Sequence, residues 1–192
     1  MIRKGWQAVR WLWIDRIVAI EPGRRLVAIK HVTQTEEHLR DHFPASARNG
    51  QASQPIMPAS LVLEGAAQAA GILVAAAQAY REKVILAKIS HATLELDAQP
   101  GDTIRFDAQL ERLDEAGASA RVLLAIAPSQ APAYPAPAGS VQLLFSHIDK
   151  NLSGKAFPEE NFVIGESFRT LLRTSGLPLP EELDASPGAS PG

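Results

Sequence analysis

The sequence predicts an α+β fold in which an antiparallel sheet surrounds one long buried helix. The first observation is that residues 58–82 are rich in Ala and Leu, which are strong helix formers. The second is that the strongly polar side chains of this segment up to residue 80 are Glu64, Gln68 and Gln78, so the helix is apolar on nearly every side and should be buried. The third is that four segments with strand character follow it, joined by turns.

The N-terminal part is expected to begin as an arm. Residues 6–20 combine aliphatic side chains with Trp6, Trp11 and Trp13, which are expected to form the docking face of a short N-terminal helix or an extended arm. Rings of this size are expected to pack in the core or at an interface rather than to bind a ligand. The turn signal Glu-Pro-Gly ends the arm at residues 21–23.

A strand, a short helical turn and a loop are expected between this arm and the long helix. Residues 24–33 are rich in β-branched side chains and predict the strand. The polar residues 35–41 predict the helical turn. Residues 44–58 contain several Pro, Gly, Asn and Ser residues and predict a loop that is longer than most connections in compact domains. Pro58 suits the first turn of the long helix, where its missing N–H costs nothing.

The four strands after the helix are read from alternating apolar and polar residues. In the first, residues 84–97, the apolar positions change parity near His91, which predicts a bulge or bend. The next strands are expected at residues 104–111, 120–126 and 141–145. A Pro/Ala-rich connector at residues 129–139 predicts an extended hairpin loop.

This order of elements predicts one domain followed by an extension. The domain is expected to span residues 1–148, with loop insertions at 45–54 and 129–139. Residues 149–192 form a C-terminal extension, in which residues 162–173 favour a helix and the last residues a weakly ordered tail.

Composition excludes several classes of function. The 192 residues carry a net charge of −2, which argues against a nucleic-acid binder, and there is no cysteine for a disulfide, a thiolate zinc site or a nucleophile. The N-terminus lacks the apolar run of a secretory signal, and the longest apolar stretch, residues 69–77, is far too short to span a bilayer. We therefore expect a cytoplasmic protein that acts neither on nucleic acid nor in a membrane.

Two polar groups stand out as candidates for acid–base chemistry. Glu64 lies early on an apolar helix with Gln68 one turn later on the same face, and burial of its carboxyl group would favour the neutral acid. His42 can accept a proton near neutral pH, and free N–H groups near Ala59 and Ser60 at the helix start can polarise a carbonyl oxygen. The residues alone leave a second interpretation open, in which His42 is a packed or exposed side chain and Glu64 faces solvent.

Several motifs in a fixed order make the interpretation more specific. They are Ile-Asp-Arg-Ile at 14–17, Glu-Pro-Gly at 21–23, His-Phe-Pro at 42–44, Pro-Ile-Met-Pro at 55–58 and Leu-Val-Leu-Glu-Gly-Ala-Ala-Gln-Ala-Ala-Gly at 61–71. In this order they resemble the β-hydroxyacyl-(acyl carrier protein) dehydratases of bacterial fatty-acid synthesis, over roughly residues 11–148. The fold of that family is the hot-dog fold, a long helix wrapped by an antiparallel sheet.

The resemblance implies a reaction and two catalytic residues. It is the reversible removal of water from a (3R)-3-hydroxyacyl thioester, which gives the trans-2-enoyl thioester. By position His42 matches the family's catalytic histidine, which takes the proton at C2, and Glu64 matches its catalytic glutamate, which protonates or orients the departing hydroxyl group.

The resemblance also implies substrate contacts and partners. Phe43, Pro58, Ala59 and Gln68 are the expected substrate-binding residues, with backbone N–H groups near Phe43 or Ala59 holding the thioester carbonyl. The acyl group arrives on acyl carrier protein or coenzyme A, and no metal or redox cofactor is implied. His42 and Glu64 are expected to face each other across a homodimer, which in the family often assembles into a trimer of dimers.

Three differences from the family pattern and two alternative functions accompany this interpretation. Ala45 and Ala59 stand where the family has Gly, and Glu64 follows His42 by 22 residues, several more than usual. One alternative is a hot-dog thioesterase, in which the helix carboxylate activates water or attacks the carbonyl. The other is an acyl-binding protein without catalysis.

Overall fold

The computed structural model describes residues 11–41, 44–46, 48, 50, 52–95, 97–128, 136–148 and 164–178. Six strands form one sheet with the order β1-β2-β4-β5-β6-β3, and every neighbouring pair is antiparallel. In chain order the elements are β1 (Arg16–Glu21), β2 (Arg25–His31), α1 (Glu37–Asp41), α2 (Ala59–Ala77), β3 (Val84–Leu94), β4 (Thr103–Asp114), β5 (Gly117–Ala127), β6 (Ala136–His147) and α4 (Glu166–Thr174). The predicted α+β fold is confirmed.

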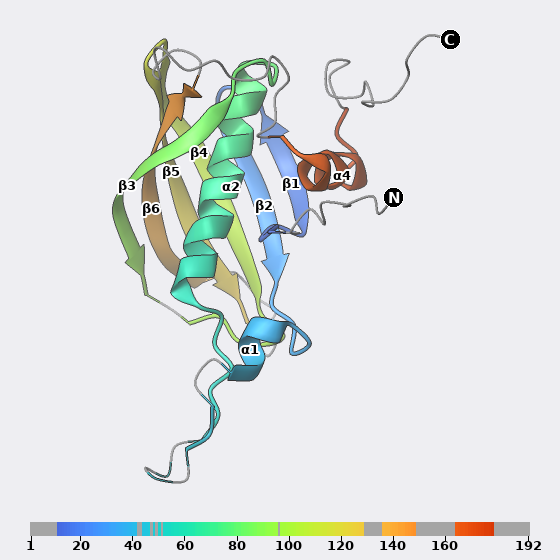
Figure 1. The fold of residues 1–192 in the computed structure, drawn as a ribbon, viewed down its shortest axis with the longest axis vertical. Coiled ribbons are helices and arrows are strands. Elements are labelled where there is room, and N and C mark those ends of the chain that lie inside the picture. The colour runs from blue at the N-terminus through green and yellow to red at the C-terminus, as the bar shows by residue number, and fades with distance from the viewer. Residues whose placement is uncertain are drawn as a thin grey trace, which may run out of the picture.

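Helix α2 lies against one face of the curved sheet and forms the centre of the core (Figure 1). Its alanines allow this close packing, since Ala66, Ala69 and Ala70 are fully buried. The largest fully buried side chain of the sheet, Phe106 of β4, belongs to the same core cluster. Helix α2 is long and apolar enough to cross a membrane by length and composition, but two thirds of it is buried within the protein. It is therefore the core helix, and the described residues contain no other helix that is long and apolar enough to cross a membrane.

The end of α2 differs from the prediction. The composition extends the helix to about residue 82, but it ends at Ala77. Ala79 and Tyr80 adopt positive φ angles of 51° and 60°, and the Tyr80 N–H donates a hydrogen bond of 2.7 Å to the carbonyl oxygen of Ala75. This reversal turns the chain back toward β3 and leaves Tyr80 partly buried, and this burial raises the pKa of its phenol.

The N-terminal segment also differs from the prediction. Residues 16–21, expected in a helix or arm, form strand β1 instead and pair with β2. Residues 11–15 precede this strand without regular structure, and Trp11 and Trp13 meet edge to face with ring centroids 5.6 Å apart. Trp6 lies outside the described residues.

Strand β3 forms one edge of the sheet and is exposed along most of its length. Its register against β6 shifts between Leu86 and Lys88 and again between Ile89 and His91, which confirms the predicted bulge near His91. Leu86, Ile89 and Leu94 are 39%, 37% and 37% exposed, so this edge presents apolar side chains to its surroundings.

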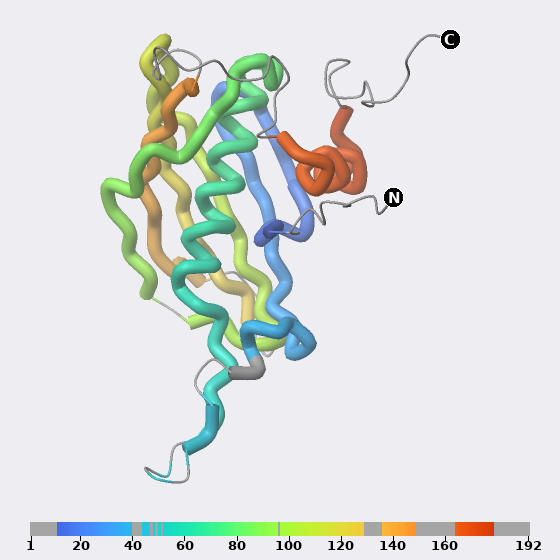
Figure 2. The backbone as a smooth tube through the Cα atoms, viewed as in Figure 1, coloured from blue at the N-terminus to red at the C-terminus, as the bar shows by residue number. Residues whose placement is uncertain are grey.

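The C-terminal extension contains the expected helix, which packs on the sheet. Helix α4 lies beside β1 at the opposite edge from β3 (Figure 2). Its Leu171 and Leu172 are 3% and 1% exposed and belong to the main core. The N–H of Ile17 donates a hydrogen bond of 2.9 Å to Ser175 Oγ, at the point where the register of β1 becomes irregular. The loop predicted at 129–139 is wrong for its last four residues, because residues 136–139 form the start of β6, which pairs with β5. The rest of this connector, residues 129–135, and the predicted tail at 179–192 lie outside the described residues.

Candidate active site

The carboxamide of Gln68 is the best-anchored polar group on α2. Only 8% of the residue is exposed. Its Oε1 accepts a hydrogen bond of 2.9 Å from the Trp13 N–H, and its Nε2 donates to the Trp11 carbonyl oxygen at 2.8 Å and to Glu64 Oε1 at 2.9 Å. All of these contacts fix which end of the amide carries nitrogen, because only Oε1 can accept from a backbone N–H. Gln68 therefore joins the N-terminal segment to Glu64.

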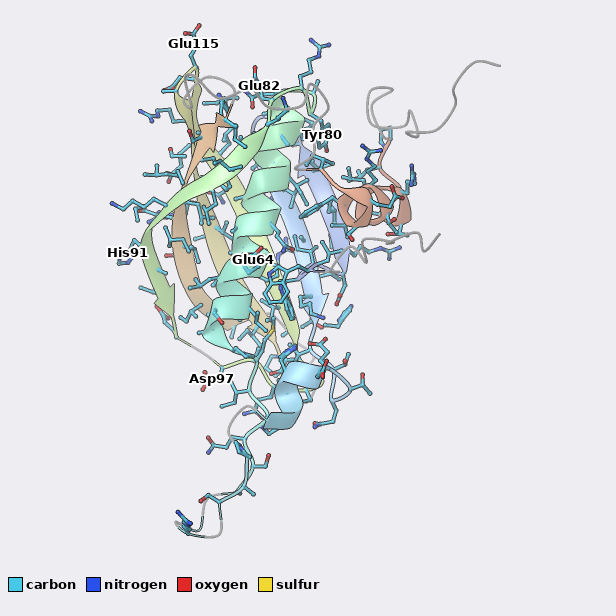
Figure 3. All side chains as sticks on the ribbon, in the orientation of Figure 1. Glu64, Tyr80, Glu82, His91, Asp97 and Glu115 are labelled. Carbon is cyan, nitrogen blue, oxygen red and sulfur yellow. The ribbon has the colours of Figure 1, made fainter. Side chains whose placement is uncertain are left out.

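Glu64 is held by this amide at one oxygen. Its Oε2 has no hydrogen-bond partner among the residues that the structure describes. The residue is half-buried and lies partway along α2, above the level of α1 (Figure 3). A carboxyl group with one oxygen fixed and the other available can donate or accept a proton at a defined position.

Glu64 and Gln68 line a mainly apolar cavity of about 240 Å³, hereafter the Glu64 cavity. Its other walls come from α2 as far as Ala75, from Glu82 between α2 and β3, from β3 and β6, and from the segment 164–168. A cavity of this shape, apolar with a few polar groups, is typical of a binding site for a small or elongated organic molecule.

The predicted residues at the start of α2 lie elsewhere. Pro58 is the N-cap, and its carbonyl oxygen accepts the N–H groups of Leu61 and Val62 at 2.9 and 3.2 Å. Ala59 and Ser60 are exposed, and neither N–H donates a hydrogen bond to another described residue. They are thus available to a ligand, as expected for the first residues of a helix.

Ala59 lines a second cavity, also of about 240 Å³, together with Met57, Val62 and Asp97. It lies at the opposite end of α2, since Figure 3 shows Asp97 below Glu64, and Tyr80 and Glu82 above it. One chain therefore brings Glu64 and Gln68 together, but it does not bring Ala59 into the same cavity. His42 and Phe43 lie outside the described residues.

Gly65, next to Glu64, allows the elements around the site to meet. A Cβ at this position would lie 2.6 Å from Phe106 Cζ and 3.0 Å from the Trp13 carbonyl oxygen. We expect Gly65→Ala to destabilise the protein by about 1–3 kcal/mol through overpacking, which exceeds the gain of about 1 kcal/mol in helix propensity. Urea unfolding tests this, with Gly71→Ala as control, because a Cβ there makes only an ordinary contact of 3.5 Å with Phe145. Equal stability of the two variants would contradict it.

Two contributions to the site have no signal in local sequence. Trp11 and Trp13 hydrogen-bond to Gln68 through backbone groups, which every residue carries. The identity of their side chains therefore does not predict these contacts. Ile164 and Phe168 line the Glu64 cavity from a segment about 100 residues further along the chain than Glu64. Only the tertiary structure brings these groups together.

Comparison with known proteins adds the evidence of relatives. Residues 8–129, more than half of the chain, match the FabA-like domain. The 3-hydroxyacyl-[acyl-carrier-protein] dehydratase FabZ of Listeria monocytogenes serotype 4b (strain CLIP80459) is 33% identical over 113 residues, which cover 58% of this chain and 73% of that protein. The enzyme of the same name from Chloroflexus aggregans is 38% identical over 104 residues, which cover 54% of this chain and 67% of that protein.

Solved structures show the same fold. A chain of the dehydratase heterocomplex ApeI:P from Xenorhabdus doucetiae superimposes with a TM-score of 0.54 and 11% identity, over 72% of this chain and 84% of that one. A thioesterase family protein from Silicibacter pomeroyi gives a TM-score of 0.52 and 12% identity, over 68% of this chain and 82% of that one. The hot-dog fold is therefore confirmed, and because dehydratases and thioesterases share it, the fold does not choose between these activities.

Proposed function

Since this chain belongs to the FabA-like family, we propose that it dehydrates (3R)-3-hydroxyacyl thioesters to trans-2-enoyl thioesters in fatty-acid or related acyl-chain synthesis. It is a hydro-lyase. The observation that carries the proposal is the Glu64 carboxyl group, held by Gln68 at the side of an apolar cavity. Such a cavity can take an alkyl chain while the carboxyl group remains at the reacting carbons.

The chemistry needs one base and one acid. The His42 imidazole removes a proton from C2 of the thioester, and the developing enolate oxygen is stabilised by N–H groups at the start of α2, near Ala59, or near Phe43. The electron pair left on C2 forms the double bond to C3 as the C3–O bond breaks. Glu64 gives its proton to the departing hydroxyl group, which leaves as water. The proton on His42 then returns to Glu64 or to solvent, and the enzyme is restored.

The substrate is carried as a thioester, and the chemistry draws only on these protein groups. Acyl carrier protein is the proposed carrier, in line with the name of the FabZ relatives, which are 3-hydroxyacyl-[acyl-carrier-protein] dehydratases, and coenzyme A is the second possibility. Proton transfer between an imidazole and a carboxyl group requires neither a metal nor a redox cofactor. The proposed location is the cytoplasm.

A complete site is proposed to need two copies of the chain. Within one chain, Ala59 and Glu64 line different cavities. A second copy that faces the open side of the Glu64 cavity can supply His42, Phe43, Pro58 and Ala59 to the Glu64 and Gln68 of the first. Strand β3 borders this cavity through Ile85 and Leu86 and exposes an apolar sheet edge, so it is the proposed contact of the homodimer. Three such dimers can assemble further.

Turnover of defined thioesters tests the function. Purified protein is incubated with (3R)-3-hydroxybutanoyl and crotonoyl thioesters, and the enoyl product or its loss is followed by ultraviolet absorbance, while a thiol reagent follows hydrolysis. We expect interconversion of the two thioesters in both directions with no release of free thiol. Release of thiol without interconversion of the two thioesters would contradict the proposal and indicate a thioesterase. Binding of the thioesters without either reaction would contradict the proposal and indicate an acyl-binding protein without catalysis.

A further inference from the structure

The C-terminal extension lines the far end of the Glu64 cavity. The cavity follows α2 from Glu64 to Ala75, over about 16 Å at 1.5 Å per residue. At the Ala75 end it meets Ile164, which is only 5% exposed and forms a small buried cluster with Ala75. Phe168, on the first turn of α4, packs against this cluster and also lines the cavity. The Glu64 carboxyl group and the wall formed by Ile164 and Phe168 thus lie at opposite ends of the same cavity.

The wall is held in place from the other side of α4. Leu171 and Leu172 are buried in the main core, and Ser175 accepts the hydrogen bond from Ile17 of β1. Arg169 Nε donates a hydrogen bond of 3.3 Å to the carbonyl oxygen of Ile164, which ties the segment before the helix to the helix itself. These contacts fix α4 against the sheet and thereby hold Phe168 at the end of the cavity.

The length of the cavity sets a scale for its occupant. The cavity follows α2 over about 16 Å, which suits the extended alkyl tail of an acyl chain.

We propose that Ile164 and Phe168 set the longest acyl chain that the enzyme accepts. This assignment rests on the proposed dehydration, in which Glu64 places C3 of the substrate at the near end of the cavity. The alkyl tail then extends along α2 toward Ala75 and stops at the two side chains. Chains of medium length fill the cavity, and longer ones meet the ring of Phe168.

The test changes the size of residue 168 in both directions. Dehydration is measured with 3-hydroxybutanoyl, 3-hydroxyoctanoyl, 3-hydroxydodecanoyl and 3-hydroxyhexadecanoyl thioesters. For Phe168→Ala we expect the ratio of kcat/KM for the hexadecanoyl over the octanoyl substrate to rise at least about tenfold. One methylene group already changes kcat/KM by about this factor in an apolar pocket, and the substitution removes a whole ring. For Phe168→Trp we expect the ratio for dodecanoyl over butanoyl substrate to fall by a similar factor.

Thr170→Ala is the matched control, because Thr170 lies on the exposed face of the same helix. It should keep the chain-length profile of the parent protein. A Phe168 variant that folds and keeps the parent profile overturns the proposal, as does a shift of equal size in Thr170→Ala.

A binding measurement separates this proposal from the proposed function. Unreactive coenzyme A thioethers with butyl, octyl, dodecyl and hexadecyl chains are added, and the rise in Tm is recorded for each protein. If the largest Tm shift occurs with a shorter chain in the parent than in Phe168→Ala, the result supports Ile164 and Phe168 as the end of the binding cavity. If no thioester is dehydrated in addition, only the proposed dehydratase function is contradicted. If the largest Tm shift occurs with the same chain length in both proteins, the proposed role of Phe168 is contradicted, whether or not turnover is seen.

Discussion

Glu64→Gln is expected to lower the turnover of a 3-hydroxyacyl thioester by about 100-fold or more, the usual size of a general acid contribution. The amide keeps the length of the side chain and can still accept the hydrogen bond from Gln68 Nε2, but it has no acidic proton to give to the departing hydroxyl group. His42→Ala is expected to cause a loss of similar size, because it removes the base. Both are measured as kcat with saturating substrate, alongside the Tm of each variant.

Glu115→Gln serves as the control for loss of a carboxylate. Glu115 is exposed in the turn between β4 and β5, far from Glu64 (Figure 3). It should leave kcat and Tm unchanged. Near-normal turnover in either His42→Ala or Glu64→Gln would remove that residue from the mechanism.

Mixing the two inactive variants tests whether the site is shared between chains. In a mixed dimer, one site combines the intact His42 of one chain with the intact Glu64 of the other, and the second site has lost both groups. Statistical exchange makes half of the dimers mixed, so we expect about a quarter of the activity of the unmodified protein to return. Refolding the two proteins together and assaying the mixture measures this. If no activity returns although mixed dimers form, both groups act within one chain.

The second large effect is expected at the exposed edge of the sheet. Ile89→Lys places a charge on β3 where a second copy is proposed to pair, and burying an unpaired charge against another strand is costly. We expect the dimer to dissociate and the turnover to fall at least about tenfold, because the separated chains hold incomplete sites. Sedimentation equilibrium gives the mass in solution, and the dehydration assay gives the turnover.

Val18→Lys is the matched control at the other edge strand. Val18 lies on β1 and is 53% exposed, so the same charge is introduced far from β3. This variant should remain dimeric and active. A monomeric Ile89→Lys protein with full activity would show that one chain is sufficient, and a monomeric parent protein would exclude the proposed pairing altogether.

The order of elements could be predicted because its strongest signals are local. The apolar sequence around α2 requires burial from every side, and the parity change near His91 marks the bulge in β3. Strand β1 was missed because only one of its residues, Ile17, is buried, so it lacks the alternation of a half-buried strand. The early end of α2 was missed because neither Ala79 nor Tyr80 is a residue that usually signals positive φ.

The site could be predicted only in part for similar reasons. Glu64 and Gln68 share a helix face, so their contact follows from a spacing of one turn. The wall at Ile164 and Phe168 depends on how α4 packs, and no periodic pattern within the chain reports a contact over such a separation. The sequence likewise does not show that Ala59 and Glu64, five residues apart on one helix, line different cavities, because this depends on the elements packed around α2.

The position of α4 has a consequence for how copies of this chain can associate. A sheet with two open edges can add strands at both sides and grow without limit into fibres. In the part of the chain that the structure describes, α4 lies against β1 and Ser175 already binds a backbone N–H there, whereas β3 is bare. If two copies pair through β3 as proposed, the β1 edges that remain are covered by α4, so the addition of strands to the sheet ends with this pair.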